Sequence, residues 1–524
     1  MLINAANIFG SRVFGLVRDI LSAAFWGSTE IMQAAFTTAF TIPNTFRSLF
    51  AEGAFSAAFV PLFAKKLEAG KEDEAWTLAC RTISLQIMLL ATICVIVSAL
   101  SGIVLLFLPP EASDQTTRLI FKILPLLIPY ALFICVAGAF AAILNALRHF
   151  AIPAATPILF NVVQIVTLVL LFVCGKTRHE FSSLIWFCVS VLIAGLLQMA
   201  VLMYCCSKKG FHFHFDFNWR NDDVKTLCRK ILPGLAGAGV HQLNILIDRT
   251  IAVFVGAAAV GAINYSNRII FLPIGIFGVA MNTICLTNMS RAKDDLEMAD
   301  CLDTALRQVL FLALPCTALL CALNTEVIRL LFQRGAFTDE SVRECALALI
   351  CYLPGLPAFC AAKVAVTTHH GRSDTLTPVI VSVICIVINF ILNISLIHSL
   401  RQGGLALASS ISSWLNVLIL LAIDTRKLPS WNCLRTLRAA LRLTIAAIVS
   451  GAAAYGMNCL LSSYLPPMNA TLTLATVIII AGGAGVVAYA AVCPLLARPE
   501  LGDFIGAFRR KRKKTPNSLA TPAQ

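Results

Sequence analysis

Apolar residues occur along this chain in long runs that short polar stretches separate. Fourteen such segments recur, and most are about as long as the roughly 20 residues that a helix needs to cross a bilayer. Because no sizeable polar block lies between them, the pattern predicts an all-α polytopic membrane protein with 14 transmembrane helices and no separate soluble domain. The segments are residues 2–26, 30–61, 78–108, 119–145, 153–174, 181–205, 230–255, 259–288, 302–333, 342–368, 376–398, 404–424, 436–462 and 471–496.

The composition agrees with a membrane protein. Hydrophobic residues make up 58% of the 524 residues and charged residues 13%, with a mean hydropathy of +0.83. The 19 cysteines are scattered without a CxxC spacing, so we expect small buried hydrophobes rather than disulfides or metal ligands. Since the chain has no nucleotide-binding loop, HExxH sequence or nucleophile motif, we expect a protein that is not an enzyme.

The stretch Ile42–Pro61 places charges inside an apolar segment. Arg47 and Glu52 lie within it, and a charge at the centre of a membrane helix costs roughly 2.5–3.5 kcal/mol. Such residues usually face a protein interior or a wet cavity and mark a substrate path. Pro43 and Gly53 bracket the two charges, so we expect a bent or broken helix there. The alternative is a helix end that enters the headgroup region.

Positive charge is concentrated in alternate loops. The positive-inside rule places the basic loops in the cytoplasm, so both termini are predicted to be cytoplasmic. The net charge of +14 is then mostly topogenic, and the basic run 509–514 indicates a contact with anionic lipid rather than nucleic acid. The basic loops hold Lys65, Lys66, Lys71, Arg148, Lys208, Lys209, Arg220, Lys225, Arg291, Lys293, Arg372, Arg426, Lys427 and Arg435, whereas the opposite loops hold only a few, among them Lys176, Arg178, Arg334 and Arg401.

An internal repeat relates the two halves of the chain. The stretch Asn44–Phe50 around Arg47 has a counterpart 221 residues later in Tyr265–Phe271 around Arg268. Segments 1–6 and 7–12 therefore read as two parallel copies of a six-helix unit, related by an axis along the membrane normal. The alternative is chance similarity between apolar helices. The predicted parts are an N-lobe (1–206), an inter-lobe loop (207–229), a C-lobe (230–425), a C-terminal helix pair (426–497) and a basic tail (498–524).

The first segment contains three charged residues. Arg12 and Asp19 are seven residues apart and share a helix face, so we expect them to pair. Arg18 is rotated by about 100° from Asp19 around the helix. This rotation predicts that Arg18 is freer to face a cavity.

Three arginines of the apolar segments suit an anionic ligand. In a two-lobe arrangement Arg18, Arg47 and Arg268 would all point at a central space, where cations outnumber acids. The planar guanidinium fork of arginine favours phosphate or carboxylate. The alternative is structural: each arginine pairs with Asp19, Glu52 or a carbonyl and only holds the lobes together.

Oxygen-bearing side chains form a second candidate site. Asp248 lies on segment 7, Asn389 and Asn393 share one face of segment 11, and Ser409 lies on segment 12. Such oxygens could bind a hard monovalent cation such as sodium. Interhelical hydrogen bonding is the slightly favoured alternative, and Asp248 could instead pair with Arg249.

The segment Phe211–Phe217 alternates phenylalanine with polar residues. Together with Trp219 it indicates an interfacial stretch of the cytoplasmic loop between the lobes. A metal site at His212 and His214 is the less favoured interpretation.

Several motifs resemble those of a known family. The matching residues are Ser11–Asp19, Phe40–Asn44, Arg47, Phe50–Phe55, Ala58–Pro61, Arg268, Pro273, Gly275, Gly278, Leu331–Gly335, Phe337 and Thr338. They resemble the MurJ (MviN) lipid II flippases, most specifically over the first 60 residues. The similarity covers nearly the whole chain.

The resemblance implies the multidrug/oligosaccharidyl-lipid/polysaccharide exporter fold. It also implies export of lipid II, the undecaprenyl diphosphate-linked disaccharide peptide, from the inner to the outer leaflet of the bacterial inner membrane for cell wall biogenesis. In this family the arginines that match Arg18, Arg47 and Arg268 serve the diphosphate. Asp19, Glu52 and Asn44 are expected beside them in the substrate site. The last two segments would form a groove for the polyprenyl tail.

The chain departs from the family pattern at four positions. Some members are thought to bind sodium at the positions of Asp248, Asn389, Asn393 and Ser409, but Asn393 stands where those members have an acid. Three further changes concern gating: Ala34 replaces an aspartate, Ser48 a second arginine and Thr287 a proline.

The leading hypothesis is a monomeric lipid II flippase that works by alternating access and needs no cofactor apart from a possible sodium ion. Its expected partners are lipid II and membrane lipids, without nucleic acid. One alternative is a drug or polysaccharide-lipid exporter of the same fold, although cationic drugs would need an acidic cavity. A second alternative is a membrane scaffold without transport, for which the arginines would be dispensable.

Overall fold

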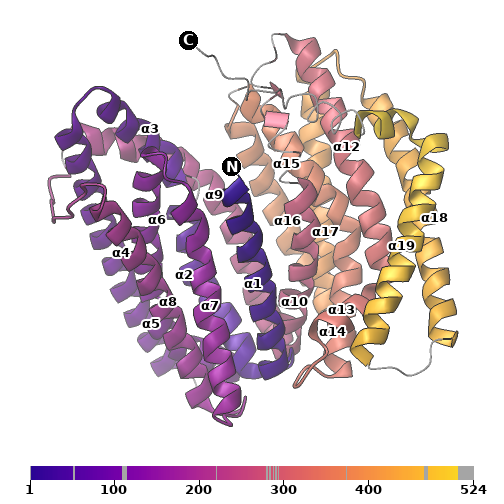
Figure 1. Cartoon of the computed structure of the whole chain (residues 1–524), viewed down its shortest axis with the longest axis horizontal. Helices are drawn as coiled ribbons and strands as arrows, with labels where there is room; N and C mark the ends of the chain where they lie inside the picture. Colours follow the sequence, from indigo (N-terminus) through magenta and orange to yellow (C-terminus); the bar gives the residue numbers. More distant parts are fainter. Residues whose placement is uncertain are drawn as a thin grey trace, which may run out of the picture. The chain divides into compact units, whose positions relative to one another are not determined.

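A computed structural model gives the fold, and every regular element in its described part is helical (Figure 1). The structure describes residues 2–50, 54–108, 115–219, 221–278, 281, 285, 286, 288, 289, 292, 294–372, 374–464 and 470–504. The contacts divide the chain into two compact units. Unit 1 comprises Met1–Tyr265 and Phe332–Glu344, and unit 2 comprises Ser266–Leu331 and Cys345–Gln524.

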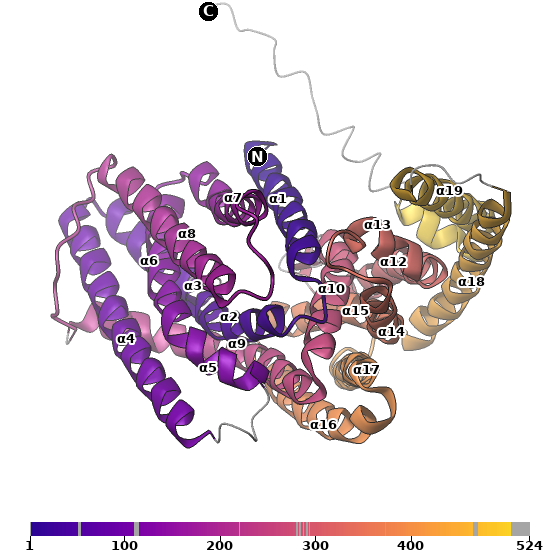
Figure 2. The same cartoon turned by 90° about the horizontal axis from the view of Figure 1, so that it is seen from below.

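Unit 1 contains the first nine helices and the beginning of the next. The helix pairs α1 with α7 and α6 with α8 pack along much of their lengths (Figure 2). The helices are α1 (Leu2–Trp26), α2 (Ile31–Phe50), α3 (Ala54–Glu68), α4 (Glu72–Phe107), α5 (Gln115–Leu127), α6 (Pro129–Ala146), α7 (Ala151–Val173), α8 (Phe181–Ser207), α9 (Asp222–Val255) and α10 (Ala257–Pro273), the last of which continues into unit 2.

An aromatic ladder organises the core of unit 1. Phe55, Phe59 and Phe63 are four residues apart on α3, and their rings stack at 5.3 Å between successive centroids. This i, i+4 spacing places the three rings on one helix face. That face is buried against α4 and α6, and Trp76 lies edge-on to Phe63 at 5.3 Å.

The last two helices of unit 2, α18 and α19, pack side by side (Figure 1). Helix α18 also lies along α12, and α16 lies along α17. The elements are the π-helix η1 (Ile274–Gly278), α12 (Asp295–Ala322), α13 (Asn324–Phe332), α14 (Asp339–Tyr352), the 3-10 helix η2 (Leu353–Gly355), α15 (Leu356–Gly371), α16 (Leu376–Leu400), α17 (Gln402–Lys427), α18 (Cys433–Tyr464) and α19 (Ala470–Leu496); the ends of α13 and α14 belong to unit 1.

Each of the 14 predicted apolar segments overlaps a helix in the described part of the chain, and the structure divides five of them between two or more elements. Segment 30–61 becomes α2 and the first half of α3, and segment 342–368 becomes α14, η2 and α15. Eleven helices of the described part are long and apolar enough to cross a membrane. Helices α1, α2 and α9 fall outside this set, because their charged and polar residues lower their apolar character.

The predicted break near Pro43 does not occur at the proline itself. Helix α2 continues through Pro43 to Phe50, and α3 begins at Ala54. Gly53 and Glu52, which were expected at the break, lie outside the described residues.

The division by contacts follows different boundaries from the predicted lobes. Helix α9 contacts α2 and α3 and belongs to unit 1, whereas the sequence repeat assigns residues 230–255 to the second copy. The two units are defined by which residues contact one another, whereas the predicted lobes are defined by similarity between two stretches of sequence. The division into units therefore does not test the predicted sequence repeat.

The predicted interfacial segment 211–217 packs on unit 1 at one end. Phe211 is 1% exposed and lies against Trp76 and Phe140. Farther along, Phe215 and Phe217 are exposed, as an interfacial role requires. All 19 cysteines are free thiols, and nine of them are buried.

Candidate functional site

Arg18 pairs with its neighbour Asp19 on α1. The Arg18 Nη2 and Nε atoms donate to Asp19 Oδ1 at 2.7 and 3.2 Å, and the side chains are 16% and 14% exposed. Arg18 is therefore less free than its rotation around the helix predicted, and its contact with Asp19 is the one that the structural alternative named. The two Cβ atoms do point apart, but the arginine side chain is long enough to fold back along the helix. Its guanidinium also lies 5.7 Å from the ring centroid of Phe160 on α7, within range of a cation–π contact.

Arg47 and Asn44 form a second polar pair on α2. They are one turn apart, and Arg47 Nε donates to Asn44 Oδ1 at 2.9 Å. The next residue, Ser48, accepts a hydrogen bond from Gln242 of α9 at 2.9 Å. Serine at this position, where the family pattern has an arginine, thus connects two helices of unit 1.

Arg268 lies on the part of α10 that belongs to unit 2, and its side chain is exposed. The helix is fixed nearby because buried Ser266 donates to the Cys345 carbonyl at 2.8 Å. Five residues after Arg268 the helix reaches Pro273, and the π-helix η1 follows directly. Such π-helical turns are frequent at functional sites.

The candidate cation ligands are distributed over the two units. Asp248 belongs to unit 1, where Asn244 Nδ2 donates to its Oδ2 at 3.4 Å. In unit 2, Asn393 Nδ2 donates to Asn389 Oδ1 at 3.0 Å, and both side chains are buried. Half-buried Ser409 lies on the adjacent helix α17. The asparagine pair confirms that positions 389 and 393 share one helix face.

Among the described residues, no three His, Cys, Asp or Glu side chains lie close enough to hold a metal ion. Cys80 Sγ lies 3.5 Å from His214 Nδ1. Asp216 in the same segment instead accepts from Arg81 at 2.7 Å. The backbone amide of Asn218 and the Arg81 guanidinium lower the pKa of Asp216 below its ordinary value.

Sequence reasoning missed a buried charge cluster at one end of α15, α16 and α17. His369 is fully buried, with Nδ1 at 3.3 Å from Asp374 and Nε2 at 3.5 Å from Asp424, which is also fully buried. Asp374 also binds Lys427 at 2.6 Å, and this bond holds the pKa of Asp374 well below its ordinary range. No short motif marks this cluster, since its members lie up to 58 residues apart in the sequence.

A second missed network joins three parts of unit 2. Arg307 on α12 is 3% exposed and contacts Asp303 at 2.9 Å and Glu500, beyond α19, at 3.3 Å. Thr436 on α18 donates to the other oxygen of Asp303 at 2.6 Å. The i, i+4 spacing of Asp303 and Arg307 was the only local signal available.

The comparisons with known proteins decide the family. A sequence model of the family described as "Lipid II flippase MurJ" matches residues 23–476. The chain belongs to the MurJ family. It is 34% identical to a probable lipid II flippase MurJ of Rhizobium meliloti (strain 1021) over 455 residues, covering 85% of this chain and 84% of that protein. It is 32% identical to a probable lipid II flippase MurJ of Rhizobium tropici, covering 96% and 95%.

Solved structures support the fold. The chain superposes on a lipid II flippase MurJ in an inward closed conformation with a TM-score of 0.76 at 24% identity, covering 96% of this chain and all of that one. It also superposes on an inward-facing MATE multidrug transporter of the MOP superfamily with a TM-score of 0.68 at 14% identity, covering 82% of this chain and 98% of that one. The resemblance in the sequence is thereby confirmed at the level of family and helical fold.

Proposed function

We propose that this protein moves lipid II from the inner to the outer leaflet of the bacterial inner membrane. The observation that carries the proposal is membership of the MurJ family over residues 23–476, supported by relatives that are named lipid II flippases and covered over most of their lengths. The protein is thus a transporter of a lipid-linked cell wall precursor and not an enzyme.

Arg18, Arg47 and Arg268 are proposed to bind the substrate diphosphate. A planar guanidinium donates two parallel hydrogen bonds to phosphate oxygens, and two of the three arginines are already oriented by neighbours, Asp19 and Asn44. The case for Arg268 rests on the sequence repeat. The neighbouring polar groups Asp19 and Asn44 position the guanidinium groups, and Glu52 is assigned the same role from the family pattern.

The proposed architecture has 14 transmembrane helices in two six-helix lobes, with the C-terminal pair alongside them. In the alternating-access cycle the two lobes rock about the bound diphosphate, while α18 and α19 guide the polyprenyl tail. The charge asymmetry of the loops favours cytoplasmic termini. A monomer suffices for this cycle because each chain carries both lobes.

Sodium is the cation proposed for the second site. Asp248, Asn389, Asn393 and Ser409 offer oxygen donors, which hard cations prefer. Asn389 Oδ1 already accepts a hydrogen bond from Asn393, but a carbonyl oxygen has a second lone pair. The set carries one negative charge, so we assign sodium a role in resetting the empty carrier rather than in binding substrate.

The membrane potential is the proposed driving force. The headgroup carries negative charge outward, and a negative interior drives this movement by about 2.3 kcal/mol per charge per 100 mV. If the arginines move with the headgroup, the net charge that crosses is smaller. We expect that collapse of the potential stops flipping and that removal of sodium has a smaller effect.

One experiment separates the two energy sources. Outer-leaflet lipid II is measured in cells treated with an ionophore that abolishes the potential but leaves the pH gradient. Loss of the outer-leaflet signal supports the potential as the driver. Unchanged flipping would exclude it and assign the coupling to the ion site, where Asp248→Asn should slow turnover.

The second candidate function is export of a drug or another lipid-linked sugar. Similarity of the fold to a MATE transporter favours it, although at 14% identity this similarity concerns the fold alone. A cationic drug would require acidic groups where this chain has Arg18, Arg47 and Arg268. The experiment measures binding of lipid II to the purified protein and then adds cationic drugs as competitors. Displacement of lipid II by the drugs would favour the drug exporter, and binding that the drugs leave unchanged favours the lipid II flippase.

A further inference from the structure

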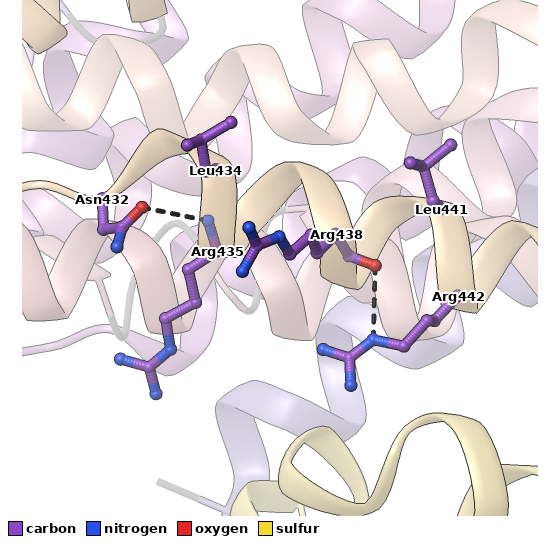
Figure 3. A pocket seen from close by; sticks show the side chains of 6 residues that line it. All are labelled: Asn432, Leu434, Arg435, Arg438, Leu441 and Arg442. Carbon is purple, nitrogen blue, oxygen red and sulfur yellow. Dashed lines mark hydrogen bonds between the residues drawn. The ribbon is translucent and has the colours of Figure 1, made fainter.

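An open pocket of about 660 Å³ lies on the first three turns of α18 (Figure 3). Three arginines line it and form what we term the arginine row: Arg435, Arg438 and Arg442. Leu434 and Leu441 line the same pocket. Figure 3 shows the two leucines on one side of the helix and Arg435 and Arg442 on the other. A polar ridge and an apolar ridge therefore run side by side along one helix.

The arginine row has an excess of positive charge. Arg435 lies 3.6 Å from Asp303, which already pairs with buried Arg307. In the described part of the chain, neither Arg438 nor Arg442 has an acidic group within salt-bridge distance, and both side chains are exposed. Arg442 Nε donates to the Arg438 carbonyl at 3.3 Å, which uses one of its five donors. Most donors of the row thus remain available for an external anion.

The position of the row along α18 fixes its depth in the membrane. After Arg442 the helix contains no charged residue up to its end at Tyr464. These residues span about 33 Å at 1.5 Å per residue, close to the roughly 30 Å thickness of the hydrocarbon core. The arginine row therefore lies at the level of the lipid headgroups. The outward helix face continues past the row with exposed Ile445 and Ile448, as expected for a surface that faces acyl chains.

The opposite face of α18 is anchored to the protein. Thr436 donates to buried Asp303, and Leu443 and Ala446 pack in an apolar cluster with Tyr489 of α19. Helix α18 thus cannot easily rotate to cover the row. The arginine row is therefore a fixed feature of the surface. Its charge and the adjacent leucines are complementary to a ligand that has an anionic head and apolar chains.

We propose that the arginine row binds the phosphate of an anionic glycerophospholipid of the adjacent leaflet, with the acyl chains along Leu434, Leu441 and Ile445. Guanidinium groups donate to the phosphodiester oxygens, and the leucines contact the first methylenes of the chains. A zwitterionic lipid carries its own cation, which is repelled by the row. The site therefore prefers phosphatidylglycerol to phosphatidylcholine.

The test uses the purified full-length protein and fluorescent phosphatidylglycerol in detergent micelles. Arg435→Gln, Arg438→Gln and Arg442→Gln together should weaken binding about 100-fold, since each basic residue at a membrane surface contributes about fivefold. The matched control replaces Lys208, Lys209 and Lys225 with glutamine, an equal loss of charge in unit 1, and should leave binding unchanged. Arg438→Gln alone, at an exposed position, gives about a fivefold loss if the triple variant fails to fold.

Four outcomes would overturn the proposal. Binding that the triple and single variants leave unchanged would exclude the row. Equal affinity for phosphatidylcholine would show a site for acyl chains alone. Displacement of the lipid by inorganic phosphate, or stronger binding of a polyprenyl diphosphate, would assign the row to a soluble anion or to the transported substrate.

Discussion

Arg307 and the arginine row lie close together in unit 2, yet their surroundings differ. Arg307 is 3% exposed and contacts the carboxylates of Asp303 and Glu500, whereas Arg438 and Arg442 are exposed and line an open pocket. A buried arginine among acids already has its anions, so its role is to join α12, α18 and the chain beyond α19. An arginine that keeps its donors available can take an anion from outside. Arg18 and Arg47 lie between these extremes, since both are half-buried.

The first way to test this comparison is to remove the buried arginine. Arg307→Ala should destabilise the protein by about 3–5 kcal/mol, because buried Glu500 loses its cation and Asp303 keeps only the more distant Arg435, at 3.6 Å. The measurement is thermal unfolding in detergent, with Arg442→Ala as the exposed control. Equal melting temperatures for the two variants would contradict the structural role of Arg307.

Removing Arg47 should separate function from stability. Arg47→Ala should leave the protein inserted and folded but lower flipping by about 30-fold or more, as truncation of a charged contact costs about 2–5 kcal/mol. Arg47→Lys should restore only part of the activity, because lysine lacks the bidentate fork. Growth of cells with each variant as the only copy measures the effect. Normal growth of the alanine variants of Arg18, Arg47 and Arg268 would show that none of the three arginines is needed for transport and that their role is at most structural.

The cluster around His369 extends the comparison to a buried acid. Both carboxylate oxygens of Asp424 are buried without a hydrogen-bond partner in the described part of the chain. Asp424→Asn removes a charge from this environment, and we expect stability to be unchanged or to rise by about 1–3 kcal/mol. Thermal unfolding at neutral pH measures the change. A clear decrease would show that Asp424 and His369 form a stabilising ion pair.

The smallest expected effect concerns Asp374 at the edge of that cluster. Lys427 lowers the pKa of Asp374, so the stabilisation is present above the ordinary aspartate pKa of about 3.9 and is lost as the pH falls through the lowered value. Because Lys427 is 42% exposed, the pair contributes about 0–1 kcal/mol. Asp374→Asn should therefore reduce the melting temperature slightly at pH 7 and by less at pH 2. An equal difference at both pH values would exclude the ion pair as its cause.

The sequence predicted the helices better than the contacts of their side chains. Apolar runs identify membrane helices directly, because a bilayer requires long apolar segments. Side-chain pairing is harder to predict, as Arg18 illustrates. Helical spacing predicted that Asp19 pairs with Arg12, but the long flexible side chain of the adjacent Arg18 also reaches Asp19. The shared helix face of Asn389 and Asn393 was predictable because positions i and i+4 of a helix are neighbours on its surface.

The contacts between distant segments could not be predicted from one sequence. Arg307 and Glu500 are 193 residues apart, and no local pattern connects them. Arg435 was interpreted only as part of a basic loop that sets topology, and Arg438 and Arg442 lie within the predicted apolar segment 436–462, where no role was assigned to them. Its open pocket and its anchored inner face depend on how α18 packs against α12 and α19.

The central claim is that this protein carries lipid II across the membrane. The most direct measurement is the amount of lipid II accessible at the outer leaflet when the chromosomal copy is depleted and a plasmid supplies either the wild-type chain or Arg47→Ala. We predict that depletion traps lipid II in the inner leaflet, that the wild-type chain restores the outer-leaflet pool, and that Arg47→Ala does not, although it is present in the membrane in equal amount. An outer-leaflet pool that is unaffected by depletion would contradict the account.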